Sequence, residues 1–411
     1  MNILFITVEN YRDCSCRSIY MDMIKKFVQC GNHVTVLSAC EERDQKCDDQ
    51  LFYHVGENCE IQKVLIPNLT KMSNYVLKGI NLLRTVPRFD IAAKKAMRNK
   101  VFDLVIYGSP PISVYKAVKS VKRQQNAFSY LMLKDIWPYD CLFGGALSMH
   151  GWKKIAYLYL AHLARKLYRV SDFIGCMSPA NIRFLTENEP GLDRSKIGIC
   201  PNCVTPFSVY MNTEKRNVLR DKYGIPKDKV VYIYGGNLGV AQGIEFAIES
   251  VIAASEIEDA FFVFVGSGTE ISKLERVANE SELKNFLLLP AMPKDEYETL
   301  VFACDVGLIY LNYDCLAPNY PSRLLSYMQA SIPILCATDL YTDIGRIAIE
   351  NGYGLQCNSN NVLSFIKCLK ELSDEEIRHR MGKKAYEYMM EHYTSERVVR
   401  QILERVEKVR N

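Results

Sequence analysis

Short apolar runs alternate with longer segments in which apolar residues recur at helical spacing. An apolar run at residues 1–8 is followed by a helical pattern at about 18–30 and by a second apolar run at 33–38. Short apolar runs bounded by polar residues are typical of buried strands. A strand, a helix and a strand in this order predict a parallel sheet with crossover helices. We therefore expect an α/β, doubly wound fold.

The same pattern occurs again in the second half of the chain. Further strands are expected at 103–107, 128–133, 173–177 and 196–199, and then at 229–234, 261–265, 286–289, 305–310 and 334–337. Residues 205–216 lack the pattern and are expected to connect two domains. The predicted boundaries are an N-terminal domain at 1–204, a C-terminal domain at 205–385, and a C-terminal helix at 386–411 that packs back across the junction.

Glycine, proline and polar residues gather after several of these strands. The first domain has such loops at 108–111 and 134–138, and the second has them at 235–239, 266–268 and 290–293. Doubly wound sheets bind ligands at the carboxyl ends of their strands, and glycines let backbone N–H groups approach a phosphate. The sequence has no GxGxxG run of the kind found in dinucleotide dehydrogenases. These loops indicate a site for a phosphate-bearing ligand.

Residues 305–338 combine a strand, a loop with two prolines and a helix expected to begin after Ser322 as its N-cap. Arg323 would lie at the start of that helix, where free N–H groups and the helix dipole favour an anion. Its planar, forked guanidinium suits phosphate oxygens. We interpret this stretch as the site for the diphosphate of a nucleotide-sugar. The alternative is that Arg323 is a solvated surface residue.

Charge is distributed unevenly along the chain. Residues 1–200 contain 28 basic and 18 acidic residues, and the remainder contains 23 and 29, so the net charges are +10 and −6. Two segments are both basic and amphipathic: 71–100, which we expect to be interrupted at Pro87, and 153–169. We interpret them as contacts with an anionic membrane surface, each basic residue contributing about 1 kcal/mol. The alternative is two ordinary helices with solvated basic faces.

The chain has neither an apolar run of membrane-spanning length nor a signal-peptide pattern at its start. Its 15 cysteines show no metal-ligand spacing, so we expect reduced thiols in a cytoplasm. The expected location is cytoplasmic, peripheral on the inner face of the cell membrane. Nucleic-acid binding is not expected, because the basic residues form amphipathic helices without a recognisable module.

Six motifs in order carry a family resemblance: SPP at 109–111, DIWP at 135–138, CPNCV at 200–204, GNLGVAQG at 236–243, VGSG at 265–268 and PSRLLSYMQASIPIL at 321–335. With these motifs the chain resembles the GT-B glycosyltransferases. More narrowly, it resembles the retaining family-four enzymes that build bacterial surface polysaccharides such as capsule, O-antigen and exopolysaccharide. The resemblance implies two Rossmann-like domains that face each other across a cleft.

It also implies a reaction. A sugar would pass from a nucleotide-sugar, expected to be a UDP-sugar, to a growing glycan linked to polyprenyl diphosphate. The anomeric configuration would be retained, without a metal or other cofactor. Catalytic roles are expected for Asp135 and Arg323, donor binding for Gly236, Asn237, Gln242, Gly266, Gly268, Ala291, Arg323 and Ser326, and acceptor-side roles for Asp13, Ser15, Ser109 and Trp137. An alternative role for Asp135 is to cap the loop before Trp137.

Three positions depart from the family pattern. Ser326 stands where such enzymes commonly carry a glutamate for the donor ribose, and Asn237 and Gln242 stand where many carry an arginine and a lysine for the diphosphate. These changes leave open a second function, a non-catalytic GT-B partner or regulator of a glycosyltransferase. A GT-B epimerase is a third function. It ranks last, because the six histidines lie outside the expected site loops.

Overall fold

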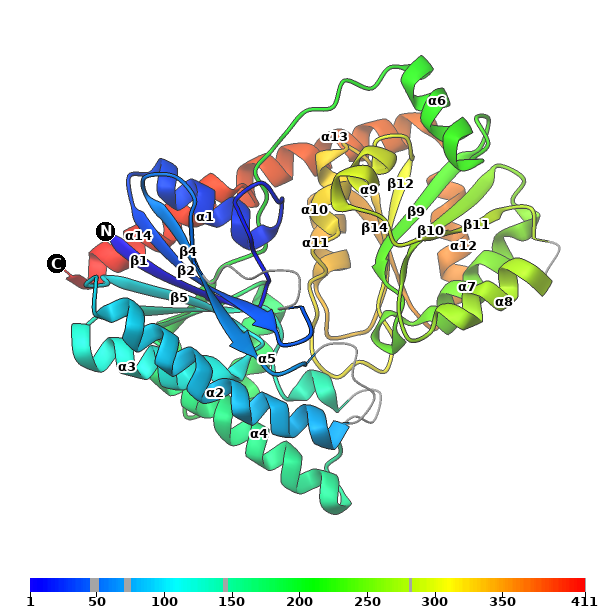
Figure 1. Ribbon diagram of the computed structural model, residues 1–411. Coiled ribbons are helices and arrows are strands. Elements are labelled where there is room, and N and C mark those ends of the chain that lie inside the picture. Colours follow the sequence, from blue (N-terminus) through cyan, green and yellow to red (C-terminus); the bar gives the residue numbers. More distant parts are fainter. Residues whose placement is uncertain (45–51, 70–74, 143–146, 281–282, 411) are drawn as a thin grey trace. The chain divides into compact units, whose positions relative to one another are not determined.

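The computed structural model describes residues 1–44, 52–69, 75–142, 147–280 and 283–410. Contacts within the chain group it into two compact units. Unit 1 comprises Met1–Val204 and Ser395–Asn411, and unit 2 comprises Thr205–Thr394. Each unit is a sheet covered by helices on both faces (Figure 1).

Unit 1 is built on an eight-stranded sheet in the order β3-β4-β2-β1-β5-β6-β7-β8. All pairs are parallel except the edge strand β3, which runs antiparallel to β4. The pattern of apolar runs did not predict β3 and β4. The strands are β1 Asn2–Thr7, β2 His33–Glu41, β3 Phe52–His54, β4 Cys59–Ile66, β5 Leu104–Ser109, β6 Phe128–Leu133, β7 Phe173–Cys176 and β8 Ile197–Ile199.

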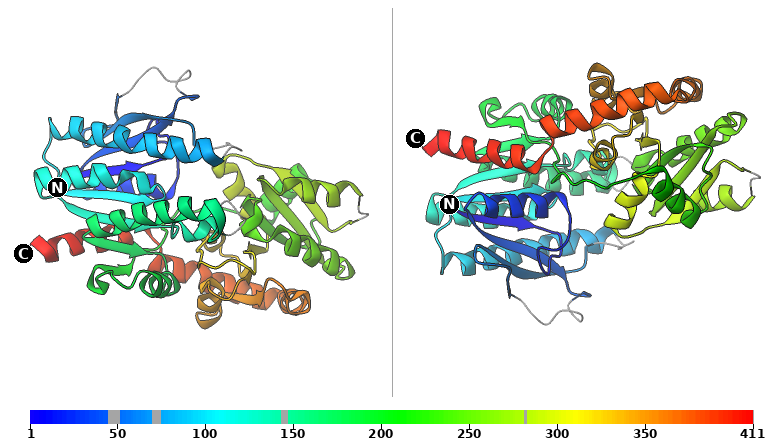
Figure 2. Two further views of the ribbon diagram at one scale, coloured as in Figure 1. Left: turned by 90° about the horizontal axis from the view of Figure 1, so that it is seen from below. Right: turned by 90° about the horizontal axis from the view of Figure 1, so that it is seen from above.

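Helices cover both faces of this sheet because alternate side chains of each strand point to opposite sides. Ile3 and Phe5 pack with α1 and α14, whereas Leu4 and Ile6 belong to the core under α2, α3, α4 and α5. Figure 2 shows α2, α3 and α4 following one another over one face of the unit. The helices are α1 Ile19–Gln29, α2 Tyr75–Met97, α3 Tyr115–Gln125, α4 Gly151–Val170, α5 Pro179–Asn188 and α14 Ser395–Arg410.

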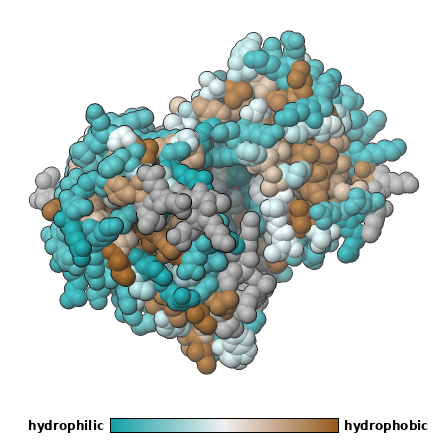
Figure 3. Space-filling view, viewed as in Figure 1, coloured by the Kyte–Doolittle hydropathy of each residue, from teal (hydrophilic) through white to brown (hydrophobic). Residues whose placement is uncertain are grey.

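The outer surface of α2 and α4 is partly apolar. Trp152 and Ile155 near the start of α4 are 66% and 72% exposed, and Leu77 and Ile80 near the start of α2 are 45% and 49% exposed. The space-filling view shows apolar residues gathered at the lower end of unit 1, over the region where α4 begins (Figure 3).

Two predictions about helices in this unit were wrong. Helix α2 is continuous through Pro87, because buried side chains on both sides of the proline, Val86 and Phe89, hold it against the core. The segment 386–411 is not one helix: its first part ends α13 at His392, and α14 begins at Ser395. Residues 71–74 of the basic segment lie outside the described residues.

Unit 2 is built on a six-stranded parallel sheet in the order β11-β10-β9-β12-β13-β14. Its strands are β9 Val230–Asn237, β10 Ala260–Ser267, β11 Phe286–Pro290, β12 Val306–Tyr310, β13 Ile334–Thr338 and β14 Gly354–Asn358. Its helices are α6 Thr213–Tyr223, α7 Ile244–Ala253, α8 Ile271–Glu280, α9 Lys294–Val301, α10 Leu324–Gln329, α11 Ile344–Glu350, α12 Val362–Glu371 and α13 Glu375–His392. Helices α7, α8 and α12 cover one face and α9, α10 and α11 the other (Figure 1).

Two helix starts in unit 2 depend on the local backbone. Helix α7 begins at Ile244, because Gly243 has a φ of +59° and lies in the left-handed region that interrupts a helix. The connection expected at 205–216 already contains the first turn of α6, whose N-cap Asn212 accepts a hydrogen bond from the N–H of Lys215.

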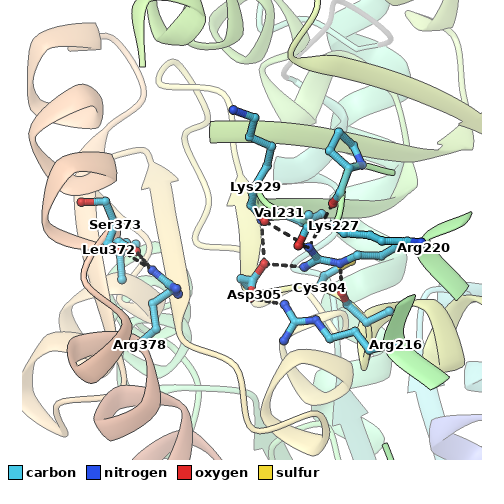
Figure 4. A network of polar contacts seen from close by, with 12 residues as sticks. Arg216, Arg220, Lys227, Lys229, Val231, Cys304, Asp305, Leu372, Ser373 and Arg378 are labelled. Carbon is cyan, nitrogen blue, oxygen red and sulfur yellow. Dashed lines mark hydrogen bonds and ion pairs between the residues drawn. The ribbon is translucent and has the colours of Figure 1, made fainter. Parts of the chain in front are cut away.

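A buried arginine joins α6 to the sheet of unit 2. Arg220 is 1% exposed, and its guanidinium donates 2.7 Å to Asp305 at the start of β12. It also donates to four backbone carbonyls, those of Ala303, Pro226, Lys227 and Lys229. Asp305 in turn accepts from the N–H of Val231 at 2.8 Å (Figure 4). Because both the charge and the hydrogen-bond donors of the Arg220 guanidinium are satisfied, this side chain can remain buried away from water.

We predict that Arg220→Met destabilises unit 2. The substitution takes the buried cation from Asp305, which keeps Arg216 and the N–H of Val231, and leaves four carbonyls without this donor. Removing one partner of a buried ion pair costs about 3–5 kcal/mol. Calorimetric melting and urea unfolding of the whole chain measure the loss. Lys215→Met, an exposed position on the same helix, is the control and is expected to change the free energy of unfolding by less than about 0.5 kcal/mol. Equal melting temperatures for Arg220→Met and the wild type would contradict this role.

Candidate functional site

The site in unit 2 begins where β9 ends, at the loop of residues 235–239. Gly236 has a φ of +123°, a backbone conformation that side chains other than glycine rarely adopt. The hydroxyl of Tyr234 donates 2.8 Å to the carbonyl of Asn237. This bond folds the loop back over the ring of Tyr234, which is fully buried.

The loops after β9 and β10 lie in direct backbone contact. The N–H of Leu238 donates to Ser267 and that of Glu270 donates to Leu238, both at 2.9 Å. A Cβ on Gly266 would lie 1.9 Å from the carbonyl oxygen of Gly236, and one on Gly268 would lie 2.2 Å from that of Leu238. These two glycines are therefore required by the packing of the two loops.

Arg323 lies over this loop. Its guanidinium carbon is 4.2 Å from the centroid of the Tyr234 ring, and its Nη2 would be 3.4 Å from a Cβ on Gly236. Its Nη1 is buried and has no hydrogen-bond partner among the residues that the structure describes. Burial raises the pKa of Tyr234, and the positive charge of Arg323 opposes that shift. A buried cation with a free donor beside a glycine loop can bind an anion.

Two further tyrosines form the floor below Arg323. Gly235 and Gly307 leave space for the rings of Tyr297 and Tyr327, because a Cβ on either glycine would lie about 2 Å from these rings. The hydroxyl of Tyr297 donates to the hydroxyl of Tyr327 at 3.4 Å, and the hydroxyl of Tyr327 donates to the carbonyl of Leu308 at 3.0 Å. Burial raises the pKa of both hydroxyls, so they remain neutral.

The expected N-cap at Ser322 was wrong by one residue. Helix α10 begins at Leu324, and Arg323 occupies its N-cap position without a side-chain cap. The N–H groups of Leu324 and Leu325 donate to the carbonyls of Pro321 and Ser322, so they are not free. The anion site therefore depends on the Arg323 side chain and not on the end of this six-residue helix.

The two amides of the loop pair with each other. Asn237 donates 2.8 Å from its Nδ2 to Oε1 of Gln242, and this oxygen also accepts from the N–H of Gly239 at 3.3 Å. At these positions the chain thus has an amide pair that shapes the loop, instead of charged side chains. The structure brings together six of the expected donor residues: Gly236, Asn237, Gln242, Gly266, Gly268 and Arg323.

The remaining two donor residues lie nearby on other elements. Ser326 follows Arg323 by one turn, and its backbone N–H donates to the carbonyl of Arg323 at 3.1 Å. Ala291 is exposed and directly follows β11, which pairs with β10.

In unit 1, the carboxyl ends of β5 and β6 bring Ser109 and Asp135 together. The N–H of Asp135 donates 3.0 Å to the carbonyl of Ser109. The peptide bonds that join Ser109 to Pro110, Pro110 to Pro111 and Trp137 to Pro138 are cis. Burial raises the pKa of Asp135 to about 6, and the charge of Lys134 opposes this shift.

The other acceptor-side residues lie in two places. Asp13 and Ser15 form a local turn in which the Asp13 carboxylate accepts from the N–H of Ser15 at 2.7 Å and from its hydroxyl at 2.5 Å. These bonds lower the pKa of Asp13. Trp137 is partly buried, and its carbonyl accepts from the hydroxyl of Tyr168 at 3.3 Å.

The motifs did not reveal several residues of these sites. Tyr234, Tyr297 and Tyr327 support Arg323, and Asp140 follows the DIWP run in unit 1. Tyr234 directly precedes the glycine pair of its loop, which was a usable signal. Tyr297 approaches Arg323 only through the tertiary fold, so local spacing gave no sign of it. Tyr327 follows Arg323 by four residues, and its backbone N–H donates to the carbonyl of Arg323 at 3.4 Å, so helical spacing could have indicated it.

Within the described parts of the chain, no three His, Cys, Asp or Glu side chains gather where they could hold a metal ion. None of the described helices combines the length and the apolar character needed to cross a bilayer.

The sequence matches known proteins over both units. Residues 215–388 match the family model described as glycosyl transferases group 1. The probable glycosyltransferase WbjE of Pseudomonas aeruginosa is 25% identical over 291 residues, which are 70% of each chain. The putative colanic acid biosynthesis glycosyl transferase WcaI of Escherichia coli K12 is 27% identical over 133 residues, or 32% of each chain.

Solved structures share the fold. Sucrose-phosphate synthase from Thermosynechococcus elongatus superposes with a TM-score of 0.76 at 14% identity, over 99% of this chain and 98% of the other. Anabaena Alr3699/HepE in complex with UDP-glucose superposes with a TM-score of 0.69 at 13% identity, over 99% and 100%.

Both sheets thus belong to a GT-B fold, as the motifs implied, and the curated relatives are named glycosyltransferases. Residues 215–388 thus form a domain of the glycosyl transferases group 1 type, and the chain is a glycosyltransferase.

Proposed function

We propose that this glycosyltransferase transfers a sugar from a UDP-sugar to a lipid-linked glycan in the biosynthesis of a bacterial surface polysaccharide. Unit 2 binds the donor and unit 1 binds the acceptor. One observation carries the donor assignment: the guanidinium of Arg323, whose buried Nη1 has no partner among the described residues, lies beside the glycine loop of β9.

The diphosphate of the donor binds at Arg323. Stacking on Tyr234 fixes the plane of the guanidinium, so its forked N–H groups are preorganised for phosphate oxygens. The backbone N–H groups around Gly236 approach the same oxygens, because glycine leaves no side chain in the way. The ribose lies near Ser326, and the base lies against the loop that contains Ala291.

The reaction breaks the bond between the anomeric carbon and the phosphate oxygen and forms a bond to an acceptor oxygen. Negative charge develops on the departing UDP, and Arg323 stabilises it electrostatically. We propose that the transfer retains the anomeric configuration and needs no metal ion, because this cation and the loop N–H groups supply the positive field. Asp135 orients the acceptor or the donor sugar.

Two similarities support UDP and a surface glycan. The Anabaena neighbour Alr3699/HepE was solved with UDP, with UDP and glucose, and with UDP-glucose. WcaI is named for colanic acid biosynthesis. In the proposed reaction the acceptor is carried by polyprenyl diphosphate, with Asp13, Ser15, Ser109 and Trp137 on the acceptor side.

The helices α2, α3 and α4 support contact of unit 1 with an anionic membrane. A groove of about 970 Å³ between them is lined by seven basic residues and one acid: Lys94, Lys116, Lys119, Lys122, Arg123, Lys166, Arg169 and Asp90. The sequence had indicated α2 and α4 but not α3, which adds four of these cations. The helices α2 and α4 also carry exposed apolar residues near their starts. In this proposal the cations contact lipid headgroups, and the apolar side chains enter the membrane interface. The protein therefore works in the cytoplasm, peripheral on the inner face of the cell membrane.

We predict that Arg323→Ala weakens UDP binding about 10- to 100-fold in calorimetric titrations. A hydrogen bond to a charged group contributes about 1.5–3 kcal/mol. The UDP affinity of Arg323→Lys is expected to lie between those of Arg323→Ala and the wild type. An ammonium group keeps the charge, but it neither stacks on an aromatic ring nor donates two parallel hydrogen bonds to a phosphate. Arg346→Ala, an exposed arginine of the same unit paired with Glu350, is the matched control and should bind like the wild type.

The same titrations with GDP and ADP, each with and without Mg²⁺, identify the base of the donor nucleotide and test whether nucleotide binding needs a metal ion. We expect tight binding of UDP alone, unchanged by Mg²⁺. Unchanged UDP affinity in Arg323→Ala would refute the diphosphate assignment. Failure of all three nucleotides to bind would favour the non-catalytic partner, with Ser326, Asn237 and Gln242 as the reason.

We also predict that charge reversal on α3 releases the protein from membranes. Lys116→Glu with Lys119→Glu should lower co-sedimentation with phosphatidylglycerol vesicles at least about tenfold, since each basic residue near the lipid contributes about 1 kcal/mol. Lys367→Glu with Lys370→Glu on α12 makes the same charge change in unit 2 and is the control. Equal sedimentation of both double variants would argue against the membrane surface.

A further inference from the structure

The loop between β1 and α1 folds over one face of the sheet of unit 1. Near its start, the backbone N–H of Tyr11 donates 2.8 Å to Oγ of Ser38 on β2. Its end is fixed at Ser18, the N-cap of α1, which accepts from the N–H of Met21 at 3.1 Å. Tyr11 is buried, and its hydroxyl lies 2.6 Å from Oγ of Ser18. Both ends of the loop are thus held in place through one buried tyrosine.

Between these two anchors, the loop brings one cysteine against another that lies 45 residues further along the chain. Sγ of Cys14 is 4.0 Å from Sγ of Cys59, close enough for an S–H···S contact. Cys59 begins β4 and is buried in the same core as Tyr11, whereas Cys14 is partly exposed. Next to it, Lys25 on α1 donates 3.3 Å from Nζ to the carbonyl of Cys16. The tertiary fold therefore creates a thiol pair that no CxxC spacing in the sequence indicates.

The thiols of this region differ in their readiness to ionise. The hydrogen bond with Cys59 lowers the pKa of Cys14, and the positive charge of Lys25 acts in the same direction. The same contact and burial raise the pKa of Cys59. Cys16 is more exposed, but partial desolvation and the negative charge of Glu9 raise its pKa. Because oxidants react with the thiolate, Cys14 is the reactive cysteine of the loop, and Cys59 is the second thiol within reach of it.

We propose that Cys14 and Cys59 form a redox-sensitive thiol pair that a peroxide converts into a disulfide bond. The sulfur of Cys14 first attacks the peroxide: the O–O bond breaks, a sulfenic acid forms and one water leaves. The sulfur of Cys59 then attacks the sulfenic sulfur, and the S–S bond forms as a second water leaves. With hydrogen peroxide, the two thiols lose two electrons and two protons, and the peroxide is reduced to two molecules of water. Disulfides in a cytoplasm are usually transient, because cellular thiols reduce them again.

The disulfide would change the acceptor side of unit 1. Asp13 and Ser15 flank Cys14 in the chain, and their turn is closed by the bond of 2.7 Å from the N–H of Ser15 to the Asp13 carboxylate. A covalent bond to Cys59 ties this turn to β4, so its side chains can no longer adjust to a ligand. We therefore expect the oxidised protein to transfer sugar more slowly. This expected loss rests on the proposed acceptor role of Asp13 and Ser15, whereas the thiol pair does not.

Disulfide mapping of the whole protein tests the thiol pair without any substrate. The reduced protein is treated with hydrogen peroxide, the remaining thiols are blocked with N-ethylmaleimide, and the peptides are analysed by mass spectrometry before and after reduction. We expect a cross-linked peptide that joins Cys14 to Cys59 and that dithiothreitol separates. A link from Cys14 to Cys16, or no link from Cys14 to Cys59, would overturn the proposal.

Serine variants separate the roles of the two thiols. In Cys59→Ser, peroxide should leave a sulfenic acid on Cys14 that dimedone traps, because the thiol that displaces the second water is gone. In Cys14→Ser, the thiol of Cys59 should stay free; this variant changes a partly exposed side chain and serves if Cys59→Ser does not fold. Cys16→Ser, from the same loop, is the matched control and should form the cross-link as the wild type does. Dimedone labelling of Cys16 in place of Cys14 would contradict the assignment of the reactive thiol.

Sugar transfer from UDP-glucose into the lipid extract of a bacterial membrane fraction tests the consequence. The oxidised wild type should transfer at least about tenfold more slowly than the reduced protein, since a displaced binding group has an effect of this order. Dithiothreitol should restore the rate. Cys59→Ser should keep its rate after peroxide, Cys16→Ser should lose it as the wild type does, and calorimetric UDP binding should be equal in both forms of the wild type.

The outcomes distinguish the thiol pair from the proposed function. A mapped link between Cys14 and Cys59 with an unchanged rate of transfer would refute the effect on the acceptor side. A wild type that forms the link but neither binds UDP nor transfers sugar would refute the proposed function and not the thiol pair.

Discussion

The proposed donor site depends on the stacking of one guanidinium on one aromatic ring. Arg323 lies on Tyr234, 4.2 Å from its centroid, and the same tyrosine fixes the following loop through its hydroxyl bond to Asn237. Tyr234 thus supports both the cation and the glycine loop beside it. A desolvated guanidinium over a ring gains about 2 kcal/mol from the π-system and keeps its edge free for an anion. The close approach is possible only because Gly266 and Gly268 let two loops pack backbone to backbone.

The two units use similar parallel sheets for different chemistry. In unit 2 the loops at the carboxyl ends of β9 and β10 present backbone groups and a cation, which suit a diphosphate. In unit 1 the carboxyl ends of β5 and β6 bring Ser109 and Asp135 together, and we propose that this edge binds hydroxyl groups of the acceptor. Fold and site are thus separable: the alternation of side chains along the strands builds both sheets, and a few residues after the strands decide what each sheet binds.

The periodic pattern predicted most of the fold, because buried parallel strands are short apolar runs and helices have a longer period. It missed β3 and β4, and it misplaced the N-cap of α10, whose first turn is set by backbone hydrogen bonds to Pro321 and Ser322. Pro87 did not break α2, since packing against the core outweighed the lost hydrogen bond. For the site, the motifs gave Arg323 and the glycines, but Tyr234 and Tyr297 come from distant parts of the chain. Asn237 and Gln242 were expected to touch the donor, and the structure shows them bonded to each other.

A crystal structure of the whole protein with UDP, grown without added metal, tests the central claim most directly. The account predicts that an oxygen of the diphosphate lies within hydrogen-bond distance of Nη1 of Arg323, with the guanidinium still stacked on Tyr234 and a second oxygen facing the N–H groups at Gly236. A nucleotide whose phosphates lie away from Arg323, with that nitrogen still unpaired, would contradict it.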